Sequence, residues 1–250
     1  MGNKGQKIGL ILLTTLGMNI ISYINNTPPT MAQKLLDNDR FICRGNFPNG
    51  AVKCVSKDGE YFVGNVRNGQ PEGQGIFVYA GGNRYEGQFR DGTYNGSGIF
   101  IFPKDENRYE GIFRNGLFIK GKLIFDGNVY EGEFEPLPIS QVNAIVSTPQ
   151  GKGVFTFANG ARYEGEFFFG QIRGQGVLKF KDGTRCEGQF FGNDLNGKAT
   201  CIFRNGLRYE GELRNGRPDG VGVLIEPNGK KTSGVFRAGE MLDLNQFPRK

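Results

Sequence analysis

A short motif recurs eight times along this chain at a nearly constant interval, and no other feature restricts its fold as much. The motif is an aromatic residue, a glutamate and a glycine, as in Tyr85-Glu86-Gly87. Successive copies begin 23, 24, 21, 33, 23, 23 and 23 residues apart. The copies begin at Phe62, Tyr85, Tyr109, Tyr130, Tyr163, Cys186, Tyr209 and Thr232. A period of about 20–50 residues is typical of arrays in which each repeat packs only against its neighbours.

A second glycine motif follows the first in most copies. It reads Gly-x-Gly-x-apolar-x-aromatic, as in Gly96-x-Gly98-x-Phe100-x-Phe102. Alternation with period two places apolar residues and glycines on one face of a strand and charged residues on the other. The chain has 41 glycines but also 22 phenylalanines and 9 tyrosines, whereas disordered low-complexity chains are poor in aromatics. Each copy is therefore predicted to be a β-hairpin.

The repeat that begins at Tyr163 gives the predicted register. Residues 169–174 are expected to form the turn. The expected pairs are Tyr163 with Phe180, Gly165 with Leu178 and Phe167 with Gly176. In this register each large side chain lies over a glycine on the opposite strand and covers its backbone.

The full pattern, YEGxFxxGxxxGxGxFxF, closely resembles the MORN repeat, over about residues 41–240. It departs from that pattern at Cys186 and Thr232, which replace the aromatic residue, and at Ala199, which replaces the second glycine. Residues 39–59 form a degenerate first copy with Cys54 at the aromatic position. The resemblance implies an elongated single-layer β-sheet, protein scaffolding and contact with acidic phospholipids.

The N-terminus has the pattern of a targeting segment. Lys4 and Lys7 precede an apolar run at residues 8–24, and Thr30-Met31-Ala32 follows. A basic region, an apolar region and a small-x-small site are typical of a signal peptide, with cleavage expected after Ala32. The alternative is an uncleaved membrane anchor, since 17 residues approach the length of a spanning helix. Either interpretation places the repeats outside the cytoplasm.

The predicted fold is all-β: an elongated single-layer antiparallel β-meander of 23-residue hairpins behind an N-terminal apolar helix. The domain plan is a leader at 1–32, a linker at 33–40, an array of about eight hairpins at 41–240 and a C-terminal cap at 241–250. The copy at Tyr130 has a turn extended by the insertion at residues 135–150. That insertion is either a binding loop or a tolerated surface extension.

The four cysteines fall into two local pairs, Cys43 with Cys54 and Cys186 with Cys201. Each pair flanks a hairpin turn on one face, so in an exported protein two disulfides within hairpins are expected. In a reducing compartment the same cysteines would be small buried apolar residues.

Several classes of function are excluded or disfavoured. The chain has no histidine, which removes Ser-His-Asp and Cys-His catalysis and histidine metal sites. A net charge of +6 without clusters disfavours nucleic-acid binding. The repeated glutamates mark a structural register, because an active site occurs once. We therefore expect a protein that is not an enzyme and has no cofactor or metal.

A single-layer sheet cannot bury both faces, so an aromatic groove is expected to remain exposed. The predicted function is an exported or membrane-anchored scaffold that holds an unidentified protein in that groove. The residues expected to contact the partner are Tyr85, Tyr109, Tyr130, Tyr163 and Tyr209. The same rings are alternatively packing residues. Other possible ligands are acidic phospholipid headgroups and cell-wall polysaccharide.

Overall fold

The computed structural model describes residues 40–103, 106–139, 144–192 and 196–242, and every helix or strand in them is a β-strand. These residues belong to two compact units, one ending at Ala158 and the other beginning at Asn159. We call them the N-terminal unit and the C-terminal unit. The predicted leader with its apolar helix and its cleavage site at Ala32 lies outside the described residues.

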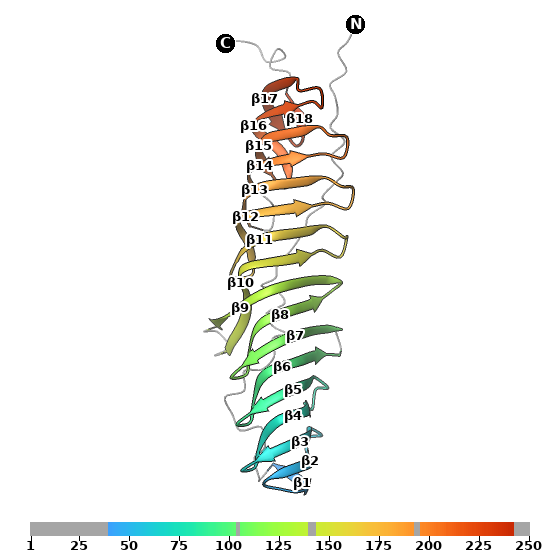
Figure 1. Cartoon of the computed structure of the whole chain (residues 1–250), viewed down its shortest axis with the longest axis vertical. Coiled ribbons are helices and arrows are strands. Elements are labelled where there is room, and N and C mark those ends of the chain that lie inside the picture. The colour runs from blue at the N-terminus through green and yellow to red at the C-terminus, as the bar shows by residue number, and fades with distance from the viewer. Residues whose placement is uncertain (1–39, 104–105, 140–143, 193–195, 243–250) are drawn as a thin grey trace. The chain divides into compact units, whose positions relative to one another are not determined.

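The N-terminal unit is an antiparallel meander of ten strands, in which each strand pairs with the next one along the chain (Figure 1). The strands are β1 (Phe41–Gly45), β2 (Gly50–Ser56), β3 (Tyr61–Arg67), β4 (Gln70–Val78), β5 (Arg84–Arg90), β6 (Thr93–Phe102), β7 (Asn107–Arg114), β8 (Leu117–Phe125), β9 (Asn128–Ile139) and β10 (Ala144–Thr156).

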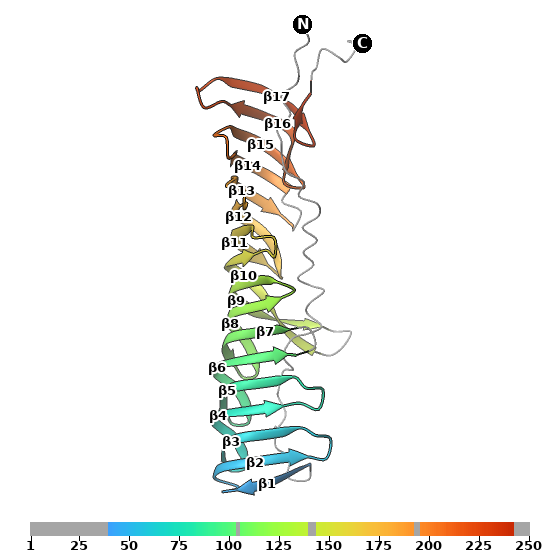
Figure 2. The ribbon, with the colours of Figure 1, turned by 90° about the vertical axis from the view of Figure 1, so that its right-hand side faces the viewer.

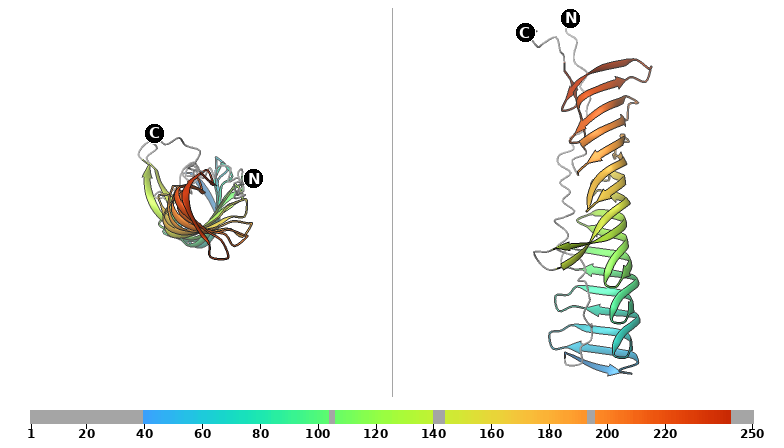
Figure 3. Two further views of the ribbon diagram at one scale, coloured as in Figure 1. Left: turned by 90° about the horizontal axis from the view of Figure 1, so that it is seen from above. Right: turned by 90° about the vertical axis from the view of Figure 1, so that its left-hand side faces the viewer.

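The C-terminal unit continues the same pattern in eight strands (Figure 2). They are β11 (Arg162–Phe168), β12 (Gln171–Lys179), β13 (Arg185–Phe191), β14 (Asn196–Ile202), β15 (Arg208–Arg214), β16 (Arg217–Ile225), β17 (Lys231–Arg237) and β18 (Glu240–Met241). Within each unit the strands are bowed rather than flat (Figure 3). The predicted all-β hairpin meander is confirmed.

The predicted register is wrong by two residues. On β11 and β12, Tyr163 faces Leu178 and Gly165 faces Gly176, so the glycines oppose each other. Phe180 lies beyond the pairing and donates its N–H to the oxygen of Thr184 in the next turn (2.8 Å). The hairpin turn is shorter than expected, because Phe168 already pairs with Gln171. Between the Gly165–Gly176 pair and the Phe167–Ile172 pair, β12 has more residues than β11, so the strand bulges there.

The two glycines of the Gly-x-Gly motif have different functions. At Gly174 the backbone has φ +104°, a region that side-chain-bearing residues rarely adopt, at the register shift. The carboxylate of Glu166 replaces a backbone partner there and accepts a hydrogen bond from the N–H of Gln175 (3.2 Å). Gly176, by contrast, lies beneath the ring of Tyr163. The first glycine therefore allows a bulge, and the second makes room for a ring.

Neighbouring repeats are joined at their turns as well as along their strands. The N–H of Gly92 donates to the oxygen of Pro71 in the preceding hairpin (3.0 Å), and Gly239 does the same with Pro218 (2.8 Å). The N–H of Asn215 donates to the side-chain oxygen of Asn196 (2.9 Å). These bonds add to the nearest-neighbour coupling that stabilises a repeat array.

The insertion at residues 135–150 lengthens a hairpin rather than forming a loop over its described part. Strands β9 and β10 have 12 and 13 residues, against seven to nine in the strands β7, β8, β11 and β12 around them. Their pairing runs from Val129 opposite Thr156 to Ile139 opposite Ala144. Of the insertion, only residues 140–143 lie outside the described residues.

Candidate interaction surface

The five tyrosines expected to contact a partner are buried, with 0–2% of each side chain exposed. They pack against other rings of the same unit. Tyr85, for example, stacks on Tyr94 with ring centroids 3.8 Å apart and meets Phe113 edge-on at 5.1 Å. Contact with a partner through these tyrosines stays a prediction, and their burial argues against it.

Four of these tyrosines cover glycine pairs, and the C-terminal unit gives the clearest case. Tyr209 lies over Gly211 on its own strand and Gly222 on the next, which oppose each other. A Cβ atom on either glycine would come within 2.5 Å of the tyrosine oxygen. The same arrangement holds for Tyr85, Tyr130 and Tyr163. At Tyr109 the ring over the pair belongs instead to Phe118, which lies close to Gly121.

Burial also changes the acidity of these side chains. It raises the pKa of Tyr163 and of Tyr209 from 10.0 to about 12, because the charged phenolate is poorly solvated beneath its neighbours. Burial raises the pKa of Tyr85, Tyr109 and Tyr130 further. At neutral pH these tyrosines are therefore neutral packing residues.

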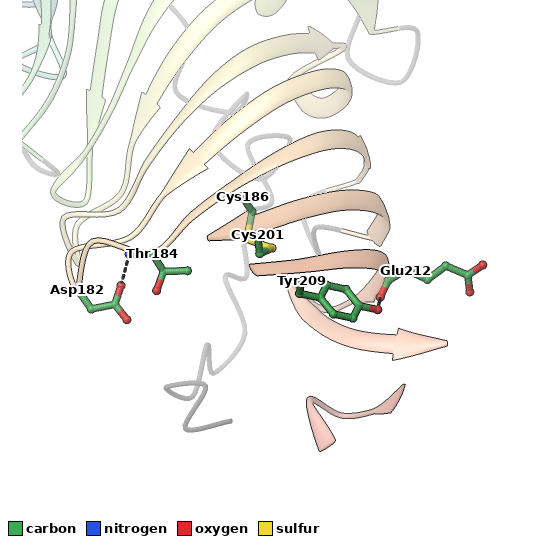
Figure 4. Close-up of a disulfide and its surroundings, with 6 residues drawn as sticks. All are labelled: Asp182, Thr184, Cys186, Cys201, Tyr209 and Glu212. Carbon is green, nitrogen blue, oxygen red and sulfur yellow. Dashed lines mark hydrogen bonds between the residues drawn. A yellow bond between two sulfur atoms is a disulfide. The ribbon is translucent and has the colours of Figure 1, made fainter. Parts of the chain in front are cut away.

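Both predicted disulfides are present, Cys43–Cys54 and Cys186–Cys201, each between directly opposed residues of one hairpin. Figure 4 shows the second of them. Cys186 and Cys201 oppose each other at the position that Tyr163 and Leu178 occupy in the preceding hairpin. No tyrosine covers the next pair, Gly188 and Ala199, and Ala199 is buried. The departures at Cys186 and Ala199 are therefore linked: without a tyrosine ring above the pair, the second glycine can be replaced by alanine, whereas a Cβ on Gly188 would still meet the backbone oxygen of Lys198 at 2.2 Å.

The repeated glutamates lie on the opposite face of the sheet, and five of them form salt bridges with the arginine two residues earlier, whereas Glu131 pairs with Lys122 (3.8 Å). The nitrogen–oxygen distance is 2.8 Å for Arg162–Glu164 and 2.6 Å for Arg185–Glu187. The remaining pairs are Arg84–Glu86, Arg108–Glu110 and Arg208–Glu210. Such exposed pairs contribute at most about 1 kcal/mol each. Their recurrence agrees with a structural interpretation of the glutamate column.

Aliphatic side chains lie between these pairs on the same face. In the N-terminal unit, Glu86 on β5 is directly flanked by Ile76 on β4 and Ile99 on β6. Ile99 is 39% exposed. This outer face therefore alternates between neutralised charge and solvent-exposed aliphatic groups, a composition suited to contact with another protein.

One part of the outer face departs from the repeat pattern. Phe168, Phe169 and Phe191 in the C-terminal unit are 41%, 40% and 49% exposed. The Arg173 guanidinium lies over the ring of Phe168, 5.0 Å from its centroid. These residues were not among those predicted to contact a partner. An alignment of the repeats would have revealed them. The residue before the turn is arginine in five other hairpins, whereas it is Phe168 or Phe191 here.

Among the described residues, no group of three or more His, Cys, Asp or Glu side chains is arranged to hold a metal ion. The same residues contain no helix of the length and hydropathy that crossing a membrane requires.

This chain belongs to the MORN repeat family. The family pattern matches at residues 62–84, 85–105, 109–118, 148–162, 163–185, 186–208 and 209–231. These segments cover more than half of the chain. The hairpin formed by β1 and β2 lies outside the matched segments, and so does the hairpin formed by β17 and β18 apart from its first residue, Lys231.

Among solved structures, the SAS-4 TCP domain of Drosophila melanogaster, in complex with a proline-rich motif of Ana2, is similar at 12% identity. The match covers 84% of this chain and 98% of that one, with a TM-score of 0.40. The TCP10 domain of Danio rerio CPAP is similar at 14% identity, with 82% and 100% covered and a TM-score of 0.38. The comparison with curated proteins gave no match.

Proposed function

We propose that this chain is a non-enzymatic scaffold that binds a protein partner on the outer face of its repeat sheet. One observation carries the proposal: the residues that recur along the repeats are engaged in holding the sheet. Tyr209 covers its glycine pair, and Glu210 is paired with Arg208. The exposed aliphatic and aromatic side chains of the outer face remain for a partner. The tyrosines support that face from beneath rather than contacting the ligand.

The two other ligands predicted from the sequence have less support. Lipid headgroups would attract the outer-face arginines, but five of these are neutralised by adjacent glutamates. Polysaccharide binding would use exposed tyrosine rings, and these are buried.

A cross-linking experiment in the native envelope fraction tests the protein-binding proposal. We expect a defined protein to cross-link to lysines of the outer face, such as Lys122 or Lys179, and to remain bound as ionic strength rises. Attraction to acidic lipid would instead fall steeply with salt. Salt-sensitive sedimentation with acidic vesicles, without a cross-linked protein, would contradict the proposal.

We further propose that the chain is exported or membrane-anchored. The two disulfides support this location, because such bonds persist in oxidising compartments. The basic and apolar N-terminal sequence points the same way. N-terminal sequencing of the native protein tests it: a mature chain beginning at Gln33 is expected. A cytoplasmic protein that retains Met1 would contradict export.

A further inference from the structure

A salt bridge found at the end of two hairpins is replaced in the first hairpin of the C-terminal unit. Arg67 pairs with Glu72 across its turn and Arg214 pairs with Asp219, each at 3.7 Å. The equivalent positions in the β11–β12 hairpin are Phe168 and Arg173. In this hairpin a phenylalanine replaces the arginine and an arginine replaces the acid. The position therefore has no carboxylate and carries one positive charge, that of Arg173, which lies over the Phe168 ring.

The turn of this hairpin departs from the pattern too. Two-residue turns with positive φ at both positions favour Asn-Gly or Asp-Gly. Asn68, Asp91, Asn115 and Asn215 occupy the first turn position in other hairpins, all with φ near +50°. Phe169 occupies it here with φ +47°. Bulky residues rarely adopt this conformation, and strained residues concentrate at binding sites.

The departures lie side by side on one face. The rings of Phe168 and Phe169 are 4.4 Å apart. Arg173 is directly opposite Phe191 on the neighbouring strand. Phe191 also lines a hollow with Lys198 and Glu212. We call Phe168, Phe169, Arg173 and Phe191 the Phe–Arg patch.

The fold does not require this patch. Other hairpins form the same turn with arginine and asparagine, and rings that are 40–49% exposed gain only part of the free energy of burial. Contiguous exposed apolar groups mark interaction sites, and aromatic residues and arginine dominate binding energy at protein interfaces. A patch that departs from the repeat at all four of its positions is suited to a partner.

We propose that the Phe–Arg patch is the docking site for a protein segment that presents a carboxylate beside an apolar side chain. The inference rests on the proposed scaffold function and names its site. Arg173 has no salt bridge among the described residues. A carboxylate pairs well with its guanidinium, while an apolar side chain covers the phenylalanine rings. The patch has a single cation, whereas attraction to an acidic bilayer grows with the number of basic residues.

The test uses the full disulfide-bonded chain and a phage library of random peptides of about twelve residues. We expect selected peptides to be enriched in Asp or Glu next to aromatic or aliphatic residues. The variant F168R/F169N/R173E introduces the residues of the β3–β4 hairpin (Arg67, Asn68 and Glu72), so it should fold. It should weaken binding of a selected synthetic peptide about tenfold or more. Arg173→Gln should weaken it less and reduce its salt dependence. The matched control Ile99→Arg, which adds a charge at an exposed position in the N-terminal unit, should leave affinity unchanged.

Two outcomes would overturn the docking site. Selected peptides that lack an acidic residue, or that bind the triple variant as tightly as the wild type, would exclude it. If vesicles that contain phosphatidylserine bound through the same residues, the patch would be a membrane-binding site instead. If a native protein partner still cross-links to the triple variant, the scaffold function stands and only the site is wrong.

Phe169→Asn provides a second readout that does not depend on the library. If Phe169 is retained for binding, asparagine at this position should relieve backbone strain and raise Tm by roughly 2 °C, and it should weaken binding of the selected peptide. A merely structural Phe169 would give a lower Tm with affinity unchanged, and that result would contradict the proposal.

Discussion

The hydroxyl of Tyr209 donates a hydrogen bond to the backbone oxygen of Glu212, three residues along the same strand, at 2.8 Å. Tyr85 bonds Gln88 in the same way at 2.9 Å, and Tyr130 bonds Glu133 at 3.1 Å. This bond holds the ring flat over a glycine pair and satisfies the polar end of a buried side chain. The tyrosine, the two glycines and the bulge therefore form one structural unit within the repeat.

Substitution of a covered glycine should destabilise the protein locally. A Cβ on Gly211 would approach the Tyr209 oxygen at 2.5 Å and the Gly222 Cα at 2.6 Å. Gly211→Ala should therefore cost about 1–3 kcal/mol, and Gly165→Val at least as much. Denaturant unfolding of each variant measures the change.

The matched controls are Glu210→Gln and Glu164→Gln, which remove a charge on the opposite face. They should change stability by no more than about 0.5 kcal/mol. Gly188 and Glu187 offer the same comparison. Equal destabilisation by the glycine and glutamate variants would show that the faces are wrongly assigned. A single glutamate whose loss abolished an activity without affecting stability would contradict the non-enzymatic function.

In the β13–β14 hairpin, replacing the disulfide by the tyrosine–leucine pair of the other repeats should preserve stability only when Ala199 is also changed to glycine. Cys186→Tyr/Cys201→Leu places a ring above Gly188 and Ala199, whose Cα atoms belong to directly opposed residues. The added ring should clash with the Ala199 methyl group, so adding Ala199→Gly should recover about 1–3 kcal/mol. Ala199→Gly alone should be neutral or destabilising. A double-mutant cycle measures the coupling, and additive effects would refute it.

Reduction should destabilise both units. The bonds Cys43–Cys54 and Cys186–Cys201 join residues separated by 11 and 15 positions. Each should stabilise by up to about 3 kcal/mol, because short closed loops restrict the unfolded chain only modestly. Thermal melts with and without reductant measure the effect, and non-reducing peptide mapping verifies the pairing. Four free thiols in protein from its native compartment would contradict it.

Stability should fall in alkaline solution. Burial raises the pKa of Tyr163 and Tyr209 from 10.0 to about 12, so at intermediate pH the unfolded chain releases protons that the folded chain retains. Their contribution is complete below pH 10 and is lost as pH rises toward about 12. Urea unfolding followed from pH 8 upward should show this decline, with tyrosinate absorbance appearing as the chain unfolds.

Tyr209→Phe is the control for that titration. It removes one ionising group and should make the alkaline decline shallower, although it loses the bond to Glu212 and lowers stability at neutral pH. Tyrosinate absorbance that appears near pH 10 in a folded protein would show that the rings are solvated.

The sequence by itself determined the repeat, the hairpins, the two faces and the cysteine pairs. Each of these follows from local period and spacing: alternation assigns Tyr163 and Glu164 to opposite faces whatever the register. It could not determine the register, because a shift of two residues leaves every side chain on its own face. The tertiary structure decided that Gly165 faces Gly176, since a two-residue turn and a bulge together set the pairing. It also decided that the aromatic column is packed, because four of the five tyrosines lie along the sheet over glycines instead of standing away from it. Only the folded strands bring Arg173 opposite Phe191, which is 18 positions away in the chain, and so create the Phe–Arg patch.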